Sequence, residues 1–335
     1  MLTVQVLIAN MVSQVILMRY ISLTIVTINS AMLGLSMRYA RTKPGDMFLP
    51  TTAVLMNEIV KFFTCLILVY IEEGRSIKKT FSTLSFQVIK VPFEMLKVCV
   101  PSLLFIIQNN LLYTAASNLD AATYQVTYQL KILFTGIFSV LILKKKLILM
   151  QWIALVMLLI GVTCVQLADT QSKSAGKILI QQNRFLGFFA AVTAGALSGC
   201  AGIFFEKILK GSNISVWVRN VQLSFLSLPL GLISVFVYDY ESVKKYGFFF
   251  GYDGFVIYVI VLQAVGGLIV AMAVKYTDSI IKSFATSLGI IITCVASIYL
   301  FNFVLSFQFV LGVAIFISSI YLYNYKTRYS VKILV

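Results

Sequence analysis

The chain has 335 residues, of which 60% are hydrophobic and 12% are charged. A soluble domain carries about 25% charged residues, so the composition excludes a water-soluble globular protein and predicts an all-α polytopic membrane protein. The net charge of +15 is spread between apolar segments, which favours a role in membrane orientation over nucleic-acid binding. There is no histidine, and the five cysteines lack metal-ligand spacing, so we expect neither a metal nor a cofactor.

The predicted elements begin with an atypical apolar segment at residues 1–18, which has neither a basic leader nor a small-residue cleavage site and stays unassigned. Residues 19–335 are predicted to form a single transmembrane domain. A helix that crosses a bilayer needs about 20 apolar residues. On this basis we place ten spans at residues 20–37, 48–70, 98–116, 122–143, 149–168, 185–205, 216–238, 255–274, 279–301 and 305–325. Longer loops are expected at 71–95, 169–184 and 239–254.

A weak internal repeat relates the two parts of the chain. Residues 114–140 align with 274–300 at a constant offset of 160. Five helices per part is an odd number, so the second copy would be inverted, with halves at about 19–168 and 185–325. Inverted repeats are typical of secondary transporters whose binding site lies near the middle of the membrane.

The distribution of lysine and arginine predicts the orientation of the spans. With a cytosolic N-terminus and ten spans, 17 of these residues fall on the cytosolic side, 8 on the other side, and Lys61 and Lys131 inside helices. Because cytosolic loops carry the excess of positive charge, we expect both termini in the cytosol.

The predicted helix 122–143 carries a polar face. Tyr124, Thr127, Tyr128, Lys131 and Thr135 follow one another at helical spacing. A lysine that faced lipid would cost ~3 kcal/mol, so Lys131 is expected to face the interior of the protein. A cation flanked by aromatic rings suits a phosphate with an adjoining base and sugar. The alternative is a lysine buried in an ion pair.

Two further polar groups interrupt apolar spans in the first half. Gln108 and Asn109 are amides that need partners in hydrocarbon, either a nucleotide or a neighbouring helix. Glu58 and Lys61 are three residues apart, a spacing that predicts an ion pair. The Glu58–Lys61 pair either neutralises its own charge or contributes to sugar contact or gating.

The second half offers similar candidates. Lys282 begins a polar stripe on the ninth span, and Lys275 lies one short joint earlier, where ordinary positive-inside charge is the alternative. Asn220, at the start of the seventh span, is a candidate contact for a ribose or sugar hydroxyl. On the sixth span, Gly195 and Gly199 have the spacing of small residues that predicts close helix packing rather than binding.

Six blocks of this sequence resemble the Golgi nucleotide-sugar transporters of the CMP-sialic acid, UDP-galactose and UDP-N-acetylglucosamine branch. The similarity runs from about Tyr20 to Tyr325, and its blocks are Gln108 to Leu111, Ser117 to Ile132, Phe205 to Lys210, Val216 to Asn220, Gly247 to Tyr252 and Val274 to Ser287. Residues 38–46 and 247–252 look closest to the UDP-galactose members. Ser224 and Ala271 depart from the tyrosine and serine typical of CMP-sialic acid members.

The resemblance implies a drug/metabolite-transporter fold of ten helices that exchanges a cytosolic UDP-sugar for lumenal UMP in the Golgi membrane, and no enzyme activity. It also implies roles for the candidate site residues. The residues expected to face the nucleotide are Gln108, Asn109, Tyr124 and Asn220, and those expected to face phosphate are Lys131 and Lys282. Glu58 and Lys61 are expected to act at the sugar end or in gating, and Lys275 is a weaker correspondence. A CMP-sialic acid transporter and a non-transporting scaffold for glycosyltransferases are the alternatives, and the sequence leaves homo-oligomerisation open.

Overall fold

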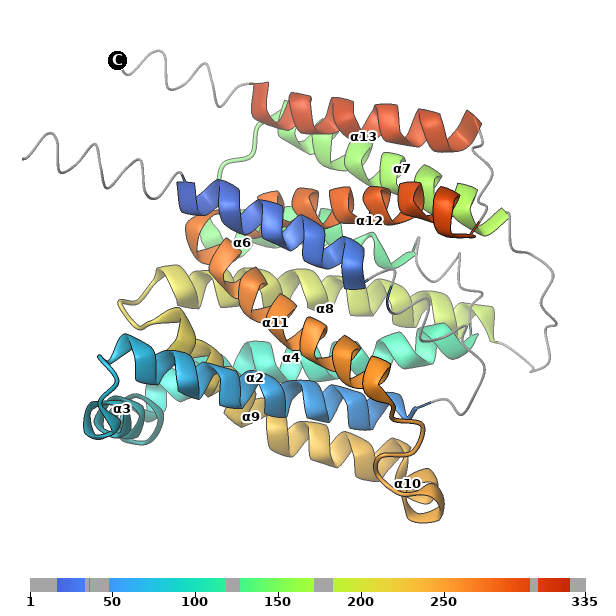
Figure 1. Cartoon of the computed structure of the whole chain (residues 1–335). Helices are drawn as coiled ribbons and strands as arrows, with labels where there is room; N and C mark the ends of the chain where they lie inside the picture. The colour runs from blue at the N-terminus through green and yellow to red at the C-terminus, as the bar shows by residue number, and fades with distance from the viewer. Residues whose placement is uncertain are drawn as a thin grey trace, which may run out of the picture. The chain divides into compact units, whose positions relative to one another are not determined.

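The computed structural model describes residues 17–33, 36, 48–118, 127–171, 183–301 and 307–325, and within these ranges it contains helices and turns but no strand (Figure 1). The elements in chain order are the helix Leu17–Leu33, α2 (Pro50–Glu72), α3 (Ile77–Leu84), the π-helix η1 (Ser85–Lys90), α4 (Pro92–Asn118), α6 (Lys131–Leu143), α7 (Leu149–Gln171), α8 (Arg184–Lys210), α9 (Val216–Tyr238), α10 (Tyr240–Tyr246), α11 (Gly254–Tyr276), α12 (Ser279–Phe301) and α13 (Phe307–Tyr325).

Most of the long helices lie where the apolar runs predict them. The predicted spans 216–238 and 279–301 coincide with α9 and α12 at both ends. Among the described residues, five helices are long and apolar enough to cross a membrane, and five shorter apolar helices accompany them. This confirms the all-helical prediction. The physical reason for it is that a segment that crosses hydrocarbon must satisfy its own backbone hydrogen bonds.

Two of the predicted loops contain helices. The segment 71–95 contains α3 and η1, and the segment 239–254 contains α10. The first turn of α3 is capped by Ser76, whose hydroxyl accepts a hydrogen bond from the backbone N–H of Lys79 at 3.5 Å. These helices are too short to cross a bilayer, so a search for long apolar runs missed them.

The predicted continuous helix 122–143 is wrong in the part that the structure describes. Residues 129 and 130 form a turn, and α6 begins only at Lys131. The backbone N–H of Leu130 donates to Thr127 at 3.2 Å, and that of Ile132 donates to Gln129 at 3.0 Å. These bonds span three residues instead of four, so the chain tightens just before Lys131.

The chain divides into two compact units. Unit 1 comprises residues 1–103 and 208–289, and unit 2 comprises residues 104–207 and 290–335. Each unit takes segments from both predicted sequence halves, because packing brings together helices that are distant in the chain. The inverted relation between the halves 19–168 and 185–325 stays a prediction.

Unit 1 is built around the packing of α2 against α9 and α11. Thr51, at the start of α2, donates a hydrogen bond to Asp239, which follows the end of α9. At the other end of α2, Ser215 donates to Glu72 just before α9 begins. The two helices are therefore antiparallel, and Figure 1 shows them side by side.

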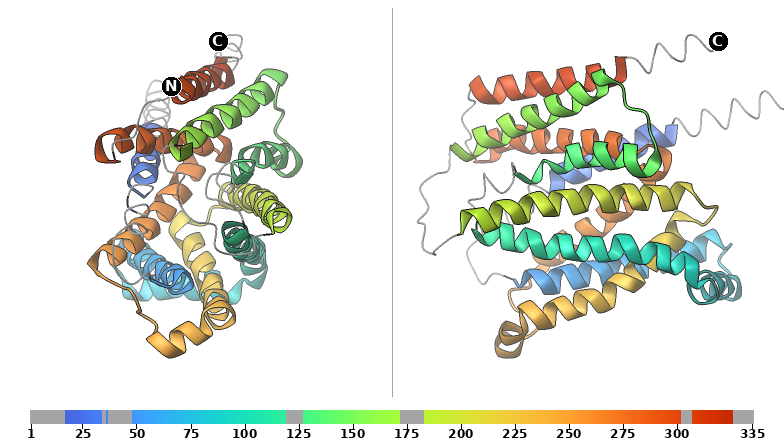
Figure 2. Two further views of the ribbon diagram at one scale, coloured as in Figure 1. Left: turned by 90° about the vertical axis from the view of Figure 1, so that its right-hand side faces the viewer. Right: turned by 180° about the vertical axis from the view of Figure 1, so that it is seen from behind.

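Unit 2 contains two close helix contacts. α7 lies along α13 (Figure 2). α8 approaches the start of α6 through its glycines, since a Cβ atom added to Gly199 would lie 2.9 Å from the backbone nitrogen of Thr135. A Cβ atom added to Gly195 would lie 3.3 Å from the backbone nitrogen of Lys131. This confirms the packing role predicted for the small-residue spacing.

Candidate functional site

Tyr128 joins three segments of unit 2 through its hydroxyl group. The side-chain amide of Gln108 on α4 donates a hydrogen bond to the Tyr128 oxygen at 3.1 Å. The Tyr128 hydroxyl in turn donates to Oγ of Ser198 on α8 at 3.2 Å. Side-chain hydrogen bonds between helices hold polar groups in fixed positions inside a membrane protein. Two predicted site residues, Gln108 and Tyr128, are thereby brought together.

Lys131 lies directly beside this group. Its ammonium nitrogen is 4.3 Å from the centre of the Tyr128 ring, within the range of a cation–π interaction. Within the described part of the chain, Lys131 forms no ion pair with a carboxylate. The alternative of a lysine neutralised by an acidic residue therefore finds no support among the described residues.

Gln108 adds an unsatisfied acceptor to the same group. The residue is buried, and its side-chain oxygen has no hydrogen-bond partner in the described structure. A buried acceptor without a partner costs about 1–3 kcal/mol, so a ligand that donates a hydrogen bond would relieve this cost. Gln108, Tyr128 and Lys131 therefore place an acceptor, an aromatic ring and a cation next to one another.

Glu58 and Lys61 form the ion pair that their spacing predicts. In unit 1, their charged atoms are 2.6 Å apart on α2, and both side chains are largely buried. The second carboxylate oxygen of Glu58 is buried and lacks a hydrogen-bond partner among the described residues, as does Oδ1 of Asn57. The pair therefore neutralises its charge, but one oxygen of Glu58 and the side-chain oxygen of the adjacent Asn57 remain without hydrogen bonds among the described residues.

The remaining predicted site residues are placed as follows. Asn220 on α9 is buried, and its amide donates to a carbonyl one turn earlier at 2.8 Å. Lys275 is exposed in the last turn of α11, and Lys282 is half-buried near the start of α12. Tyr124 and the side chain of Asn109 lie outside the residues that the structure describes.

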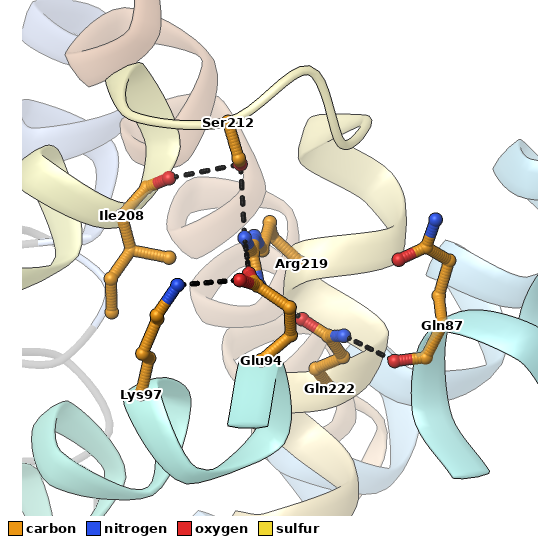
Figure 3. A network of polar contacts seen from close by, with 7 residues as sticks. All are labelled: Gln87, Glu94, Lys97, Ile208, Ser212, Arg219 and Gln222. Carbon is orange, nitrogen blue, oxygen red and sulfur yellow. Dashed lines mark hydrogen bonds and ion pairs between the residues drawn. The ribbon is translucent and has the colours of Figure 1, made fainter. Parts of the chain in front are cut away.

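Arg219 is a buried cation that is not among the predicted site residues. It is 1% exposed and forms an ion pair with Glu94 of α4 (Figure 3). Its guanidinium group also donates to Gln222 and to Ser212, each at 2.9 Å. The sequence places three polar residues, 219, 220 and 222, at the start of an apolar span, but it does not show their partners.

The same network extends to two more segments of unit 1. Glu94 also pairs with Lys97 at 2.5 Å, and the amide of Gln222 donates to the backbone oxygen of Gln87 in η1 at 2.8 Å. Four segments, η1, α4, the α8–α9 joint and α9, are thus held at one point (Figure 3). Nε of Arg219 is buried and has no hydrogen-bond partner among the described residues, so the network joins these helix ends without satisfying every group.

The comparison with known proteins decides the family. A model of the nucleotide-sugar transporter family matches residues 14–324. The chain belongs to the nucleotide-sugar transporter family. The transporter is 46% identical to a UDP-N-acetylglucosamine transporter of Bos taurus over 314 residues, which are 93% of this chain and 96% of that relative. It is 47% identical to a UDP-galactose translocator of Homo sapiens over 307 residues, 92% of this chain and 77% of that relative.

A solved structure, described only as a crystal structure of a protein, is similar to the transporter in fold alone. The TM-score is 0.61 at 11% sequence identity, covering 92% of this chain and 99% of that structure. Family membership makes the chain a polytopic membrane transporter, which confirms the prediction that it is not an enzyme.

Proposed function

We propose that the transporter carries UDP-galactose, UDP-N-acetylglucosamine or both into the Golgi lumen in exchange for UMP. Relatives named for each of these two UDP-sugars are 46% and 47% identical to the chain, so overall identity favours neither sugar over the other. Ser224 and Ala271, which depart from the pattern of CMP-sialic acid members, further favour a UDP-sugar.

The observation that carries the proposal is the environment of Lys131. Its ammonium group lies against the Tyr128 ring and has no carboxylate partner in the part of the chain that the structure describes. A phosphate group of the substrate would supply the missing negative charge, and the ring would contact an adjoining base or sugar. Gln108 would accept a hydrogen bond from the nucleotide.

Charge balance favours exchange between these two anions. A UDP-hexose carries about two negative charges, and UMP carries nearly as many because the second pKa of its phosphate is ~6. The exchange therefore moves little net charge across the membrane. Because an unoccupied Lys131 is costly to bury, the empty carrier should change orientation more slowly than the occupied one.

We further propose ten spans in two inverted halves, with both termini in the cytosol. The support is the excess of lysine and arginine on one side of the predicted spans, 17 against 8. Lys282 and Lys275, in unit 1, remain predicted contributors to substrate binding from the second half of the sequence.

The test is uptake by the purified full-length chain in vesicles loaded with UMP. We expect UMP inside the vesicles to stimulate uptake of radiolabelled UDP-galactose or UDP-N-acetylglucosamine, and not of CMP-sialic acid. Preferential uptake of CMP-sialic acid would instead identify a CMP-sugar carrier. Absence of any uptake, together with restored glycosylation in cells that lack the protein, would favour the scaffold.

A further inference from the structure

The short helix α3 exposes two large apolar side chains although it does not span the membrane. Ile77 and Phe81 lie four residues apart, hence on one face, and they are 77% and 73% exposed. No residue of α3 is buried. Exposed apolar surface of this kind marks a contact with a membrane or a partner.

The direction of α3 differs from that of the spanning helix before it. In Figure 1, α2 runs across the view whereas α3 is seen nearly end-on, so α3 crosses the direction of α2. The hydroxyl of Thr83 donates to Glu73 at 2.9 Å, and Leu84 packs against the buried cluster that includes Cys65 and Val69. These contacts hold α3 across the end of α2, a helix that is long and apolar enough to cross a membrane.

The two long helices that flank α3 in the chain also expose apolar residues. On α2, the exposed residues Phe63, Ile67 and Ile71 recur every four residues up to the end of the helix. On α4, Phe93 and Leu96 are exposed in the first turns. Since α2 and α4 are long and apolar enough to cross the membrane, we expect their exposed apolar residues to face lipid, and α3 lies between these two helices in the chain.

Positive charge lies on the rest of the α3 surface and at the end of η1. Lys78 and Lys79 are exposed, as is Lys90 at the end of η1, and within the described part of the chain none of the three forms an ion pair. The charge is therefore open to an external anion.

The acidic residues nearby are already engaged. Glu72 accepts a hydrogen bond from Ser215, Glu73 accepts one from Thr83, and Glu94 pairs with Arg219 and Lys97. The hydroxyl hydrogen bonds leave Glu72 and Glu73 negatively charged, but in the described part of the chain neither carboxylate forms an ion pair with Lys78, Lys79 or Lys90, and the three lysines outnumber these two carboxylates.

We propose that α3 is an interfacial helix that binds anionic lipid. Ile77 and Phe81 insert at the boundary between headgroups and acyl chains, and Lys78, Lys79 and Lys90 contact the phosphate groups of anionic headgroups. In the orientation proposed above, α3 faces the cytosolic leaflet, where anionic lipids are concentrated. No residue of α3 is among those that we propose to bind the substrate, so this contact with the leaflet is separate from the proposed function.

Insertion is tested by tryptophan fluorescence of the full-length chain in lipid vesicles. The variant Phe81→Trp places a reporter on the apolar face, and Ser82→Trp, one residue away and also exposed, places it on the polar face. Subtracting the signal of the unmodified chain removes the contribution of Trp152 and Trp217. Lipids brominated near the top of the acyl chain should quench the added fluorescence of Phe81→Trp more strongly than that of Ser82→Trp.

The charge preference is tested in the same system. In Phe81→Trp, brominated phosphatidylserine should quench more strongly than brominated phosphatidylcholine at equal content. Adding Lys78→Gln and Lys79→Gln should lower this preference by up to about fivefold per lysine. Lys244→Gln with Lys245→Gln, which removes two exposed charges from α10, is the matched control and should leave the preference unchanged.

These measurements need no substrate, so they remain informative if the proposed function is wrong. Equal quenching of the two tryptophan variants would overturn the insertion of the apolar face. Quenching that does not depend on Lys78 and Lys79 would overturn the binding of anionic lipid. If the reporter in Phe81→Trp were shielded from both brominated lipid and aqueous iodide, a protein would cover this face, and the proposal would also be overturned.

Discussion

The ammonium group of Lys131 lies 4.3 Å from the centre of the Tyr128 ring, and Tyr128 is held in turn by Gln108 and Ser198. Lys131 is also the first residue of α6, directly after the turn at residues 129 and 130. The position of the cation therefore depends on a local break in the helix and on contacts from two other helices. Each of these features can be tested separately.

Replacing Lys131 tests the site directly. Lys131→Ala removes the cation that would meet the substrate phosphate, so we expect exchange of UMP for UDP-sugar to fall to background. Because a buried, unpaired lysine costs ~3 kcal/mol in a membrane, the thermal stability of the variant should be unchanged or higher. Vesicle uptake and thermal unfolding measure the two effects, and exchange at the level of the unmodified chain would contradict the assignment.

The hydroxyl of Tyr128 tests the positioning of the ring. Tyr128→Phe keeps the ring beside Lys131 but removes the hydrogen bonds to Gln108 and Ser198, at a cost of about 1 kcal/mol each. We expect a higher KM for the UDP-sugar with a smaller change in maximal rate. In a double-mutant cycle with Ser198→Ala, additive effects on stability would show that the Tyr128–Ser198 bond contributes nothing.

Reversal of the Glu58–Lys61 pair distinguishes its two roles. Exchanging the charges with Glu58→Lys and Lys61→Glu retains the possibility of an ion pair at the same spacing. A pair that only neutralises itself would keep stability and transport, whereas a pair that contacts the sugar would lose transport. We expect transport to be lost while stability stays within about 1 kcal/mol, as measured by uptake and thermal unfolding.

Glu94 carries two ion pairs of unequal burial, which provides an internal control. Arg219 is 1% exposed, and its replacement in Arg219→Ala leaves hydrogen-bonding groups of Glu94, Gln222 and Ser212 unsatisfied. Breaking a buried pair costs about 3–5 kcal/mol. The Lys97 side chain is 57% exposed, and Lys97→Ala should cost about 1 kcal/mol or less. Similar melting temperatures for the two variants would refute a structural role for the Arg219 network.

Two glycines of α8 form a matched pair. A methyl group at Gly199 would lie 2.9 Å from the backbone nitrogen of Thr135, whereas at Gly202 it would meet nothing within 4 Å. We expect Gly199→Ala to destabilise the protein by about 1–3 kcal/mol because two backbones must move apart. Gly202→Ala should be neutral or stabilising by up to about 1 kcal/mol, since alanine favours helix. Thermal unfolding compares them, and equal stability would contradict the close approach of α8 to α6.

The sequence by itself determined where most helices lie. Apolar length fixes a spanning segment because lipid cannot hydrogen-bond to backbone, and so α9 and α12 begin and end where the apolar runs do. Local spacing also sufficed for the Glu58–Lys61 pair and for the packing glycines of α8, since partners within one or two turns share a helix face. The polar character of the Lys131 region was visible in the same way.

Only the tertiary structure decided which distant residues meet. Arg219 and Glu94 are 125 residues apart in the chain, and Tyr128 and Ser198 are 70 apart, so no periodicity connects them. Hydropathy likewise did not predict the turn before Lys131 or the short helices α3 and α10. Each of them depends on local hydrogen bonds and on packing rather than on apolar length. Burial of a charge such as that of Arg219 is a property of its surroundings, and the surroundings are assembled only when the helices pack.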